Sequence, residues 1–223
     1  MMLLAAKCLG DLPMSLRKED RLFTIDYPES DGKPMAETDV HYRLMTDLRF
    51  ELEQFFRDDS DVYVSGNILI YYVEGNPKKR IAPDVLVVRG VPKGDRRIYK
   101  LWEEGHAPDV VFEISSRQTW REDLNTKWRL YEELGVKEYF IFDPEYDYLV
   151  EPLIAWRLES DRYEAVEVIE GAVKSEVLDL EVVNTGETLR LRNLLTGLFL
   201  RTPLEIVQEA DRLRREVEQL KGR

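Results

Sequence analysis

Residues 108–144, PDVVFEISSRQTWREDLNTKWRLYEELGVKEYFIFDP, decide the fold class of this 223-residue chain. Residues 109–114 form an apolar run broken by one glutamate, which is typical of a strand buried on both faces. Residues 119–134 carry apolar side chains at helical spacing, and Gly135 is a typical helix stop. Residues 136–142 predict the next central strand. This order of strand, helix and strand indicates an α/β fold with helices on both sides of a sheet.

The elements before this stretch fit the same class. Residues 42–56 repeat apolar side chains at helical spacing, and Thr38 can cap the resulting helix. Residues 62–73 read as β-structure interrupted by a turn or bulge signal at Gly66 and Asn67. A short apolar strand is expected over residues 81–88, and three further antiparallel strands over residues 148–183, at the sheet edge or on one side.

The last 20 residues have a different pattern. Their apolar positions recur with spacing 4-3-4-3, which is the seam of a short coiled coil: Ile206, Ala210, Leu213, Val217 and Leu220. About two heptads are too few to be stable alone in water. The helix could dock on its own domain or fray, or it could contact a second copy in a dimer. We therefore expect an N-terminal arm (1–35), one α/β domain (36–200) and a coiled-coil-like helix (201–223).

Composition excludes several classes of protein. A hydrophobic content of 43% with 10% aromatic residues excludes wholesale disorder. The single cysteine, Cys8, excludes an internal disulfide framework and a cysteine-built zinc site, and two histidines exclude a multi-histidine metal site. No apolar stretch approaches the roughly 20 residues that a membrane-spanning helix needs. The apolar start at residues 1–6 lacks a basic flank, so we expect a cytoplasmic protein without membrane contact.

The charge is strongly negative but uneven. The net charge of 32 − 44 = −12 argues against a protein that coats nucleic acid. Residues 78–100 hold eight Lys and Arg against two acids, a net of +6, and residues 143–183 hold twelve acids against three bases, a net of −9. A polar binding face and ordinary solvated loops are both compatible with this pattern.

Three residues could carry chemistry, because each is a polar group in an element that should be apolar. Asp84 follows a proline at the start of a strand, Glu113 lies inside an apolar strand, and Lys127 lies on the next helix. Spacing of four puts Asp123 and Tyr131 on the same helical face as Lys127. Two carboxylates from adjacent strand ends suit Mg²⁺, and a nearby lysine can stabilise charge developing on a phosphate. The three residues are a minimal set for metal-dependent phosphodiester hydrolysis.

A purely structural role is the alternative for the same residues. Glu113 could form a partly buried ion pair with Lys127, since an unpaired carboxylate is costly to bury. Asp84 and Asp109 could be turn formers beside proline. Spacing alone leaves both interpretations open.

The ordered motif resembles a known family. It contains Pro108-Asp109 and Glu113, then Arg121-x-Asp123-x3-Lys127-x3-Tyr131, and ends with Gly135-Val136-x-Glu138-Tyr139 before Asp143-Pro144. This string, with Pro83-Asp84 upstream and His41 near the start of the first helix, resembles the Uma-two restriction endonucleases of the PD-(D/E)XK nuclease superfamily. The resemblance spans roughly residues 35–185.

The resemblance implies a restriction endonuclease-like fold, a mixed central β-sheet flanked by helices. It also implies Asp84 and Glu113 as ligands of Mg²⁺ or Mn²⁺, Lys127 as the active-site lysine, and DNA as substrate. The sequence departs from the superfamily pattern at Ser115, which occupies the usual lysine position two residues after the acidic residue. Lys127 on the following helix would have to reach the same space.

Further residues are weaker candidates. Glu37 could add a carboxylate, Ser115 and Gln118 could line the phosphate path or cap the helix, and Asp123 could orient Lys127. Tyr131 is expected to be a core residue and His41 an ordinary helix residue.

The leading hypothesis is a Mg²⁺-dependent endonuclease that hydrolyses DNA as a homodimer in the cytoplasm. Two alternatives stay open. One is a non-catalytic dimeric interaction module of the same fold, and the other is a hydrolase of a small phosphorylated substrate.

Overall fold

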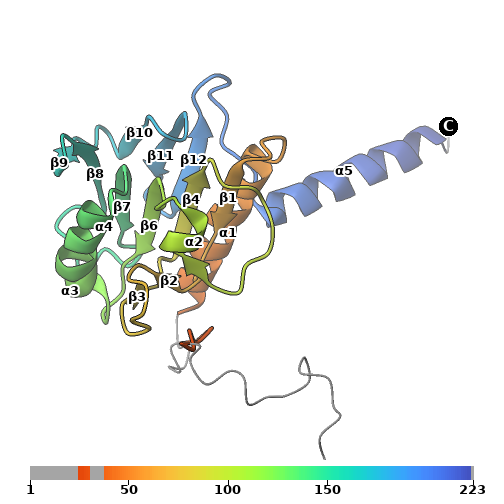
Figure 1. The fold of residues 1–223 in the computed structure, drawn as a ribbon. Coiled ribbons are helices and arrows are strands. Elements are labelled where there is room, and N and C mark those ends of the chain that lie inside the picture. The colour runs from red at the N-terminus through yellow and green to blue at the C-terminus, as the bar shows by residue number, and fades with distance from the viewer. Residues whose placement is uncertain (1–24, 31–37, 222–223) are drawn as a thin grey trace, which may run out of the picture.

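The computed structural model describes residues 25–30 and 38–221, and its centre is a six-stranded mixed sheet (Figure 1). The strand order is β1-β4-β6-β7-β8-β9. Strands β6 and β7 run parallel, whereas the other neighbouring pairs of this sheet are antiparallel. The strands are β1 (Val62–Ser65), β4 (Val85–Arg89), β6 (Val110–Ile114), β7 (Glu138–Phe142), β8 (Leu153–Glu159) and β9 (Arg162–Val166).

The parallel pair is joined by the helical crossover that the sequence predicts. This crossover consists of α3 (Trp120–Glu122), η3 (Asp123–Lys127) and α4 (Trp128–Leu134), and η3 is a π-helical turn. It ends at Gly135, whose φ of 80° is left-handed and suits glycine. Every residue of β6 and β7 is buried, as expected for central strands covered on both faces.

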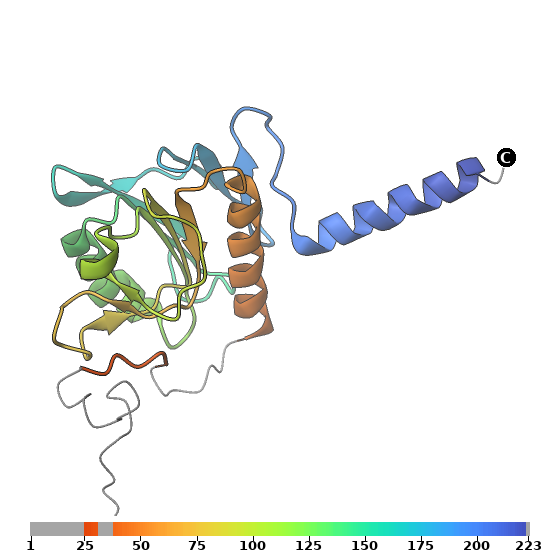
Figure 2. The ribbon, with the colours of Figure 1, turned by 45° about the vertical axis from the view of Figure 1, so that its right-hand side comes forward.

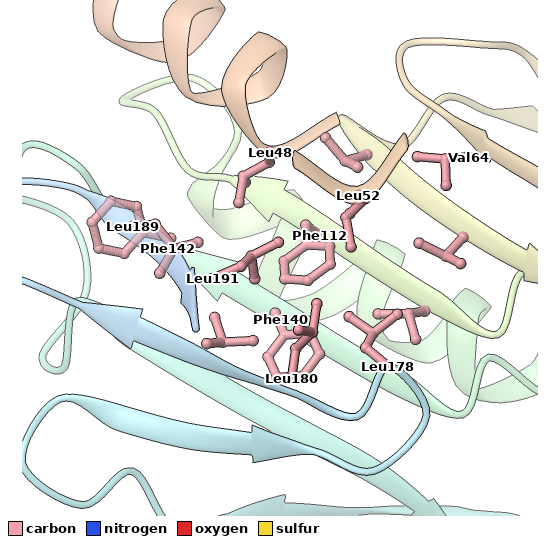
Figure 3. Close-up of a cluster of buried hydrophobic side chains, with 14 of the residues drawn as sticks. Leu48, Leu52, Val64, Phe112, Phe140, Phe142, Leu178, Leu180, Leu189 and Leu191 are labelled. Carbon is pink, nitrogen blue, oxygen red and sulfur yellow. The ribbon is translucent and has the colours of Figure 1, made fainter. Parts of the chain in front are cut away.

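One face of the sheet is covered by α1 (Asp39–Phe55) and by a second sheet (Figure 2). Thr38 caps α1, as predicted, by accepting a hydrogen bond from the His41 amide. The second sheet is formed by β10 (Ala172–Ser175), β11 (Leu180–Asn184) and β12 (Leu189–Asn193). Figure 3 shows the core between these layers, where leucines of α1, β11 and β12 surround the stacked rings of Phe112 and Phe140.

The opposite face is covered by the crossover helices and a small sheet. That sheet contains β3 (Arg80–Ile81), β2 (Ile70–Tyr71) and β5 (Tyr99–Lys100), and the short helix α2 (Leu101–Glu104) follows it. This second core is rich in tyrosine, with Tyr63, Tyr99, Tyr131, Tyr139 and Tyr163 all buried. Because side chains alternate along β6, Val111 points to this face and Phe112 to the other.

The interruption predicted at Gly66 and Asn67 is confirmed, because residues 62–73 form two strands, β1 and β2, and these belong to different sheets. Two other strand predictions were wrong in detail. Residues 81–88 are interrupted at Ala82-Pro83-Asp84, where proline cannot donate to a strand ladder. Residues 148–183 contain four strands rather than three, and the last two join β12 in a sheet that packs across the core.

The part of the predicted N-terminal arm that the structure describes, residues 25–30, packs on the second core. Tyr27 contacts the rings of Tyr71 and Trp102, and its hydroxyl accepts a hydrogen bond from the Gly75 amide at 2.7 Å. Among the helices of the described residues, none has the length and apolar character needed to cross a membrane.

The C-terminal helix α5 (Pro203–Lys221) projects away from the body, so it does not dock on its own domain (Figures 1 and 2). Only its first turn is fixed. Arg190 of β12 binds Glu205 at 2.9 Å on one side and lies 3.3 Å from Glu51 of α1 on the other. Arg190 thus connects the base of α5 to the core helix.

Glu51 is the most perturbed carboxyl of this connection. Its side chain is only 1% exposed, and burial raises its pKa from 4.5 to about 8 although Arg190 opposes the shift. Between these two pH values the folded protein holds a proton that the unfolded chain has released. Stability contributed by Glu51 is therefore present below pH 4.5 and is lost as the pH rises to 8.

We expect Glu51→Gln to remove this pH dependence, because glutamine does not titrate. Relative to the wild type, its free energy of unfolding should rise by roughly 3–5 kcal/mol between pH 5 and pH 9, at about 1.4 kcal/mol per unit of pKa difference. Urea unfolding at several pH values measures this difference. A difference between Glu51→Gln and the wild type that stays constant from pH 5 to pH 9 contradicts the assignment.

Candidate active site

The pairing of β4 with β6 brings the two predicted metal ligands together. Val85 pairs with Phe112, so one step further along the antiparallel ladder Asp84 lies opposite Glu113. The Asp84 carboxylate accepts a hydrogen bond from the Ile114 amide at 2.7 Å. Asp84 and Ile114, which are 30 positions apart in the sequence, therefore lie at the same end of the central sheet.

Glu113 is completely enclosed and both of its carboxylate oxygens have donors. Lys127 donates to Oε2 at 2.8 Å, and the Tyr131 hydroxyl donates to Oε1 at 2.6 Å. Lys127 thus reaches Glu113 from the crossover helix, as the sequence required. Each carboxylate oxygen has a second lone pair, which leaves capacity for one further ligand.

Lys127 is held from two sides. Its ammonium group lies 2.9 Å from Oδ1 of Asp123, in addition to its contact with Glu113. Asp123 is in turn fixed by the Ser115 hydroxyl, which donates to Oδ2 at 3.0 Å. Asp123 and Lys127 are the first and last residues of the π-helical turn η3, a helix form that occurs often at functional sites.

Asp84 is positioned by the first helix and by a close backbone contact. His41 Nε2 of α1 lies 3.2 Å from its Oδ1. A Cβ at Gly66 would come within 2.4 Å of the Asp84 carbonyl oxygen, so a side chain at position 66 would displace the strand start. The role of this glycine is to let β1 approach Asp84.

The carboxyl groups of the site have opposite pKa shifts. Burial raises the pKa of Glu113 well above its usual range; Lys127 opposes this shift, and the charges of Asp84 and Asp123 add to it. Burial also favours the neutral form of Asp84, but His41, Lys127 and the Ile114 amide together lower its pKa. The three neighbouring carboxyl groups outweigh the burial of Lys127 and raise its pKa, so it stays an ammonium ion.

The structure brings together most of the predicted residues but not all of them. Asp84, Glu113, Lys127, Asp123 and Ser115 form one connected cluster. Gln118 is exposed in the turn before α3, where its backbone N–H donates to the Ser116 hydroxyl. Glu37 lies outside the described residues. Asp109 lies at the other end of β6, where it accepts the Arg89 amide and pairs with Lys137.

Three contacts were missed from the sequence. Tyr131 was expected to be only a core residue, yet its hydroxyl binds Glu113, and the spacing of four after Lys127 was the available signal. His41 was expected to be an ordinary helix residue, yet it faces Asp84. Gly66 was read as a turn signal, and only the packing shows its contact with Asp84.

A groove of about 480 Å³ lies beside this cluster, along the free edge of β1. Its lining includes Gly66 but none of Asp84, Glu113 and Lys127. Three arginines of the lining are each paired with an acid: Arg49 with Glu53, Arg96 with Glu104 and Arg97 with Glu29. Ion pairs therefore neutralise part of the positive charge of the basic segment at residues 78–100.

The chain also matches a family model. Residues 16–202 match the model of the family Uma2, described as "Putative restriction endonuclease". This range is wider than the 35–185 of the sequence resemblance. No curated protein matches the chain.

A solved structure is also similar, the crystal structure of a "putative nuclease belonging to DUF820" from Anabaena variabilis. The sequences are 14% identical, the TM-score is 0.49, and the match covers 66% of this chain and 76% of the other.

We expect Tyr131→Phe to lower the free energy of unfolding by about 1–3 kcal/mol, because it leaves Oε1 of the buried Glu113 without its donor. Urea titration monitored by circular dichroism measures the change. Tyr148→Phe is the matched control, because the Tyr148 hydroxyl also donates to a glutamate, Glu145, but at the surface. Equal effects of the two substitutions would show that the Tyr131 hydroxyl does not support Glu113.

Proposed function

Because the chain belongs to the Uma2 family of restriction endonuclease-like proteins, we propose that it is a Mg²⁺-dependent endonuclease that hydrolyses DNA phosphodiester bonds. The observation that carries the proposal is the buried contact of Lys127 with Glu113, beside Asp84 on the neighbouring strand. The proposed roles are metal binding by Asp84 and Glu113 and charge stabilisation by Lys127. Mn²⁺ should substitute for Mg²⁺, since it prefers the same oxygen ligands.

The donor set fits a hard divalent cation. Three carboxyl groups, those of Asp84, Glu113 and Asp123, surround one lysine, and Asp84 and Asp123 both raise the pKa of Glu113. A cation at Asp84 and Glu113 would reduce this excess of negative charge. The described residues contain no group of three or more acidic, histidine or cysteine residues arranged to hold a metal. Two carboxylates completed by water and a substrate phosphate are the usual arrangement for Mg²⁺.

The residues of the chain have separable tasks in this proposal. A bound Mg²⁺ ion would polarise the attacking water and neutralise charge on the scissile phosphate. Lys127 remains protonated and can stabilise negative charge developing on the phosphate, which is electrostatic rather than acid–base catalysis. Tyr131 and Asp123 hold Glu113 and Lys127 in place, and His41 holds Asp84.

Access favours a phosphate that approaches from the Asp84 side. Glu113 and Asp123 are each 1% exposed, whereas the side chains of Asp84 and Lys127 are 14% and 12% exposed. A substrate therefore reaches the site through Asp84 and the ammonium group.

The single cysteine, Cys8, supports the expected cytoplasmic location, where thiols stay reduced.

The deciding experiment is cleavage of supercoiled plasmid at low salt with Mg²⁺ or Mn²⁺. We expect cleavage by the wild type and a loss of at least 100-fold in rate for Glu113→Gln, Asp84→Asn and Lys127→Met, as for removal of one electrostatic group from an active site. Lys137→Met and Glu159→Gln, at exposed positions, are matched controls that should keep full activity. Circular dichroism checks that every variant is folded.

Metal binding is the second measurement. Calorimetry should detect Mn²⁺ binding to the wild type and not to Glu113→Gln. Hydrolysis of a small phosphodiester without DNA cleavage would contradict the DNA substrate. A folded wild type that neither binds metal nor cuts DNA would contradict the enzyme altogether.

A further inference from the structure

The C-terminal helix exposes an apolar seam that the body of the protein does not cover. Its large seam residues Ile206, Leu213, Val217 and Leu220 are 38–71% exposed. Exposed apolar residues concentrate near it, because ten of the sixteen large exposed hydrophobic side chains in the described residues lie between Leu194 and Leu220. Such concentrated exposure marks an interaction surface.

The body itself cannot be the missing partner while α5 keeps this direction. Arg190 fixes the first turn of α5 through Glu205, and the rest of the helix points away from both cores (Figure 2). No residue of α5 is buried. Nothing within residues 25–30 and 38–221 therefore covers the seam.

We propose that α5 pairs with α5 of a second copy of this chain in a parallel, in-register coiled coil. The seam spacing assigns Ala210 and Val217 to heptad positions a, and it assigns Ile206, Leu213 and Leu220 to positions d. A β-branched residue at a with leucine at d favours two strands in a parallel arrangement, and Val217 with Leu213 and Leu220 follows this rule. These three positions favour a dimer, whereas the small Ala210 and the isoleucine at 206 lie outside the rule.

The charges beside the seam are complementary to themselves, which points to a second copy rather than an unrelated partner. The g positions are Glu209 and Glu216, and the e positions that follow them five residues later are Arg214 and Lys221. In a parallel dimer each g residue faces the e residue of the next heptad on the other helix. Glu209 would thus meet Arg214 of the partner subunit, and Glu216 would meet Lys221 of the partner subunit.

The same charges oppose the antiparallel arrangement. That arrangement brings g beside g and e beside e, so glutamate would face glutamate and arginine would face lysine. Within one helix Arg212 pairs with Glu209 and Arg214 pairs with Asp211. Exposed pairs of this kind contribute little, so they do not compete strongly with contacts across the dimer.

A parallel pair places both bodies at the same end of the coiled coil. Each body carries its own Asp84, Glu113 and Lys127, so two candidate sites would be joined by one two-fold axis. The dimer rests on the seam and its charges and not on the proposed nuclease activity, so either can fail without the other.

Sedimentation of the full chain at increasing concentration tests the association. We expect a dimer for the wild type and a dimer dissociation constant raised by roughly 100-fold or more for Leu213→Glu, because two buried leucines are lost per dimer. Glu218→Lys, at a b position on the outer face, is the control and should associate like the wild type. Since α5 has no buried residue, all these variants should keep the thermal stability of the body. The dilution series should span roughly 100-fold in concentration and reach about 0.1 mM. A wild type that stays monomeric throughout this series overturns the proposal.

Cross-linking tests the direction. In a Cys8→Ser background, Leu220→Cys should form a disulfide between two copies, because parallel pairing brings the two d positions within disulfide reach. An antiparallel pair would instead place d positions opposite a positions, with position 220 opposite position 210 and position 213 opposite position 217. A disulfide that forms only when Leu220→Cys is mixed with Ala210→Cys would therefore overturn the parallel arrangement.

Charge exchange tests the identity of the partner. One variant carries Glu209→Arg and Glu216→Arg, and a second carries Arg214→Glu and Lys221→Glu. Each should associate about tenfold more weakly with itself than the wild type does, and a mixture of the two should form a heterodimer. Unchanged self-association of both variants would show that these charges do not face a second copy.

Discussion

The central constraint on this structure is a carboxylate in the middle of a fully buried strand. Glu113 has apolar neighbours on both sides in β6, and the ladder to β4 and β7 leaves it only 1% exposed. Burying it requires donors, and these come from one helix, where Lys127 and Tyr131 lie four residues apart. The crossover from β6 to β7 is therefore fixed against the sheet by the same contacts that build the candidate site.

The two faces of the sheet have different roles: one forms an apolar core, and the other contains the candidate site. The face under α1 and β10–β12 is lined by leucine, valine and phenylalanine, whose only requirement is close packing. The other face contains the tyrosines, and their hydroxyls need partners when they are buried. Tyr131 finds its partner in Glu113, and Tyr139 finds its partner in the Asp123 carbonyl oxygen. Polar groups that would weaken an ordinary core thus hold the candidate site in one arrangement.

Much of this arrangement could be predicted because it depends on local spacing. The run around Glu113, the helix over residues 119–134 and the stop at Gly135 follow from period and composition, and all three are present. The positions of Asp123 and Lys127 on one helical face also follow from spacing. Strand pairing was less predictable. Nothing in the period of residues 148–183 distinguishes β9, which extends the central sheet, from β10, which belongs to the sheet across the core.

The sequence by itself determined which groups carry charge in apolar surroundings and which apolar residues form the C-terminal seam. These are properties of residue type and spacing along one segment. The tertiary structure alone decided that Asp84 stands opposite Glu113, that His41 and Gly66 position Asp84, and that α5 leaves its seam uncovered. Those facts depend on contacts between segments far apart in the chain, and such contacts follow from the packing of whole faces rather than from any local pattern.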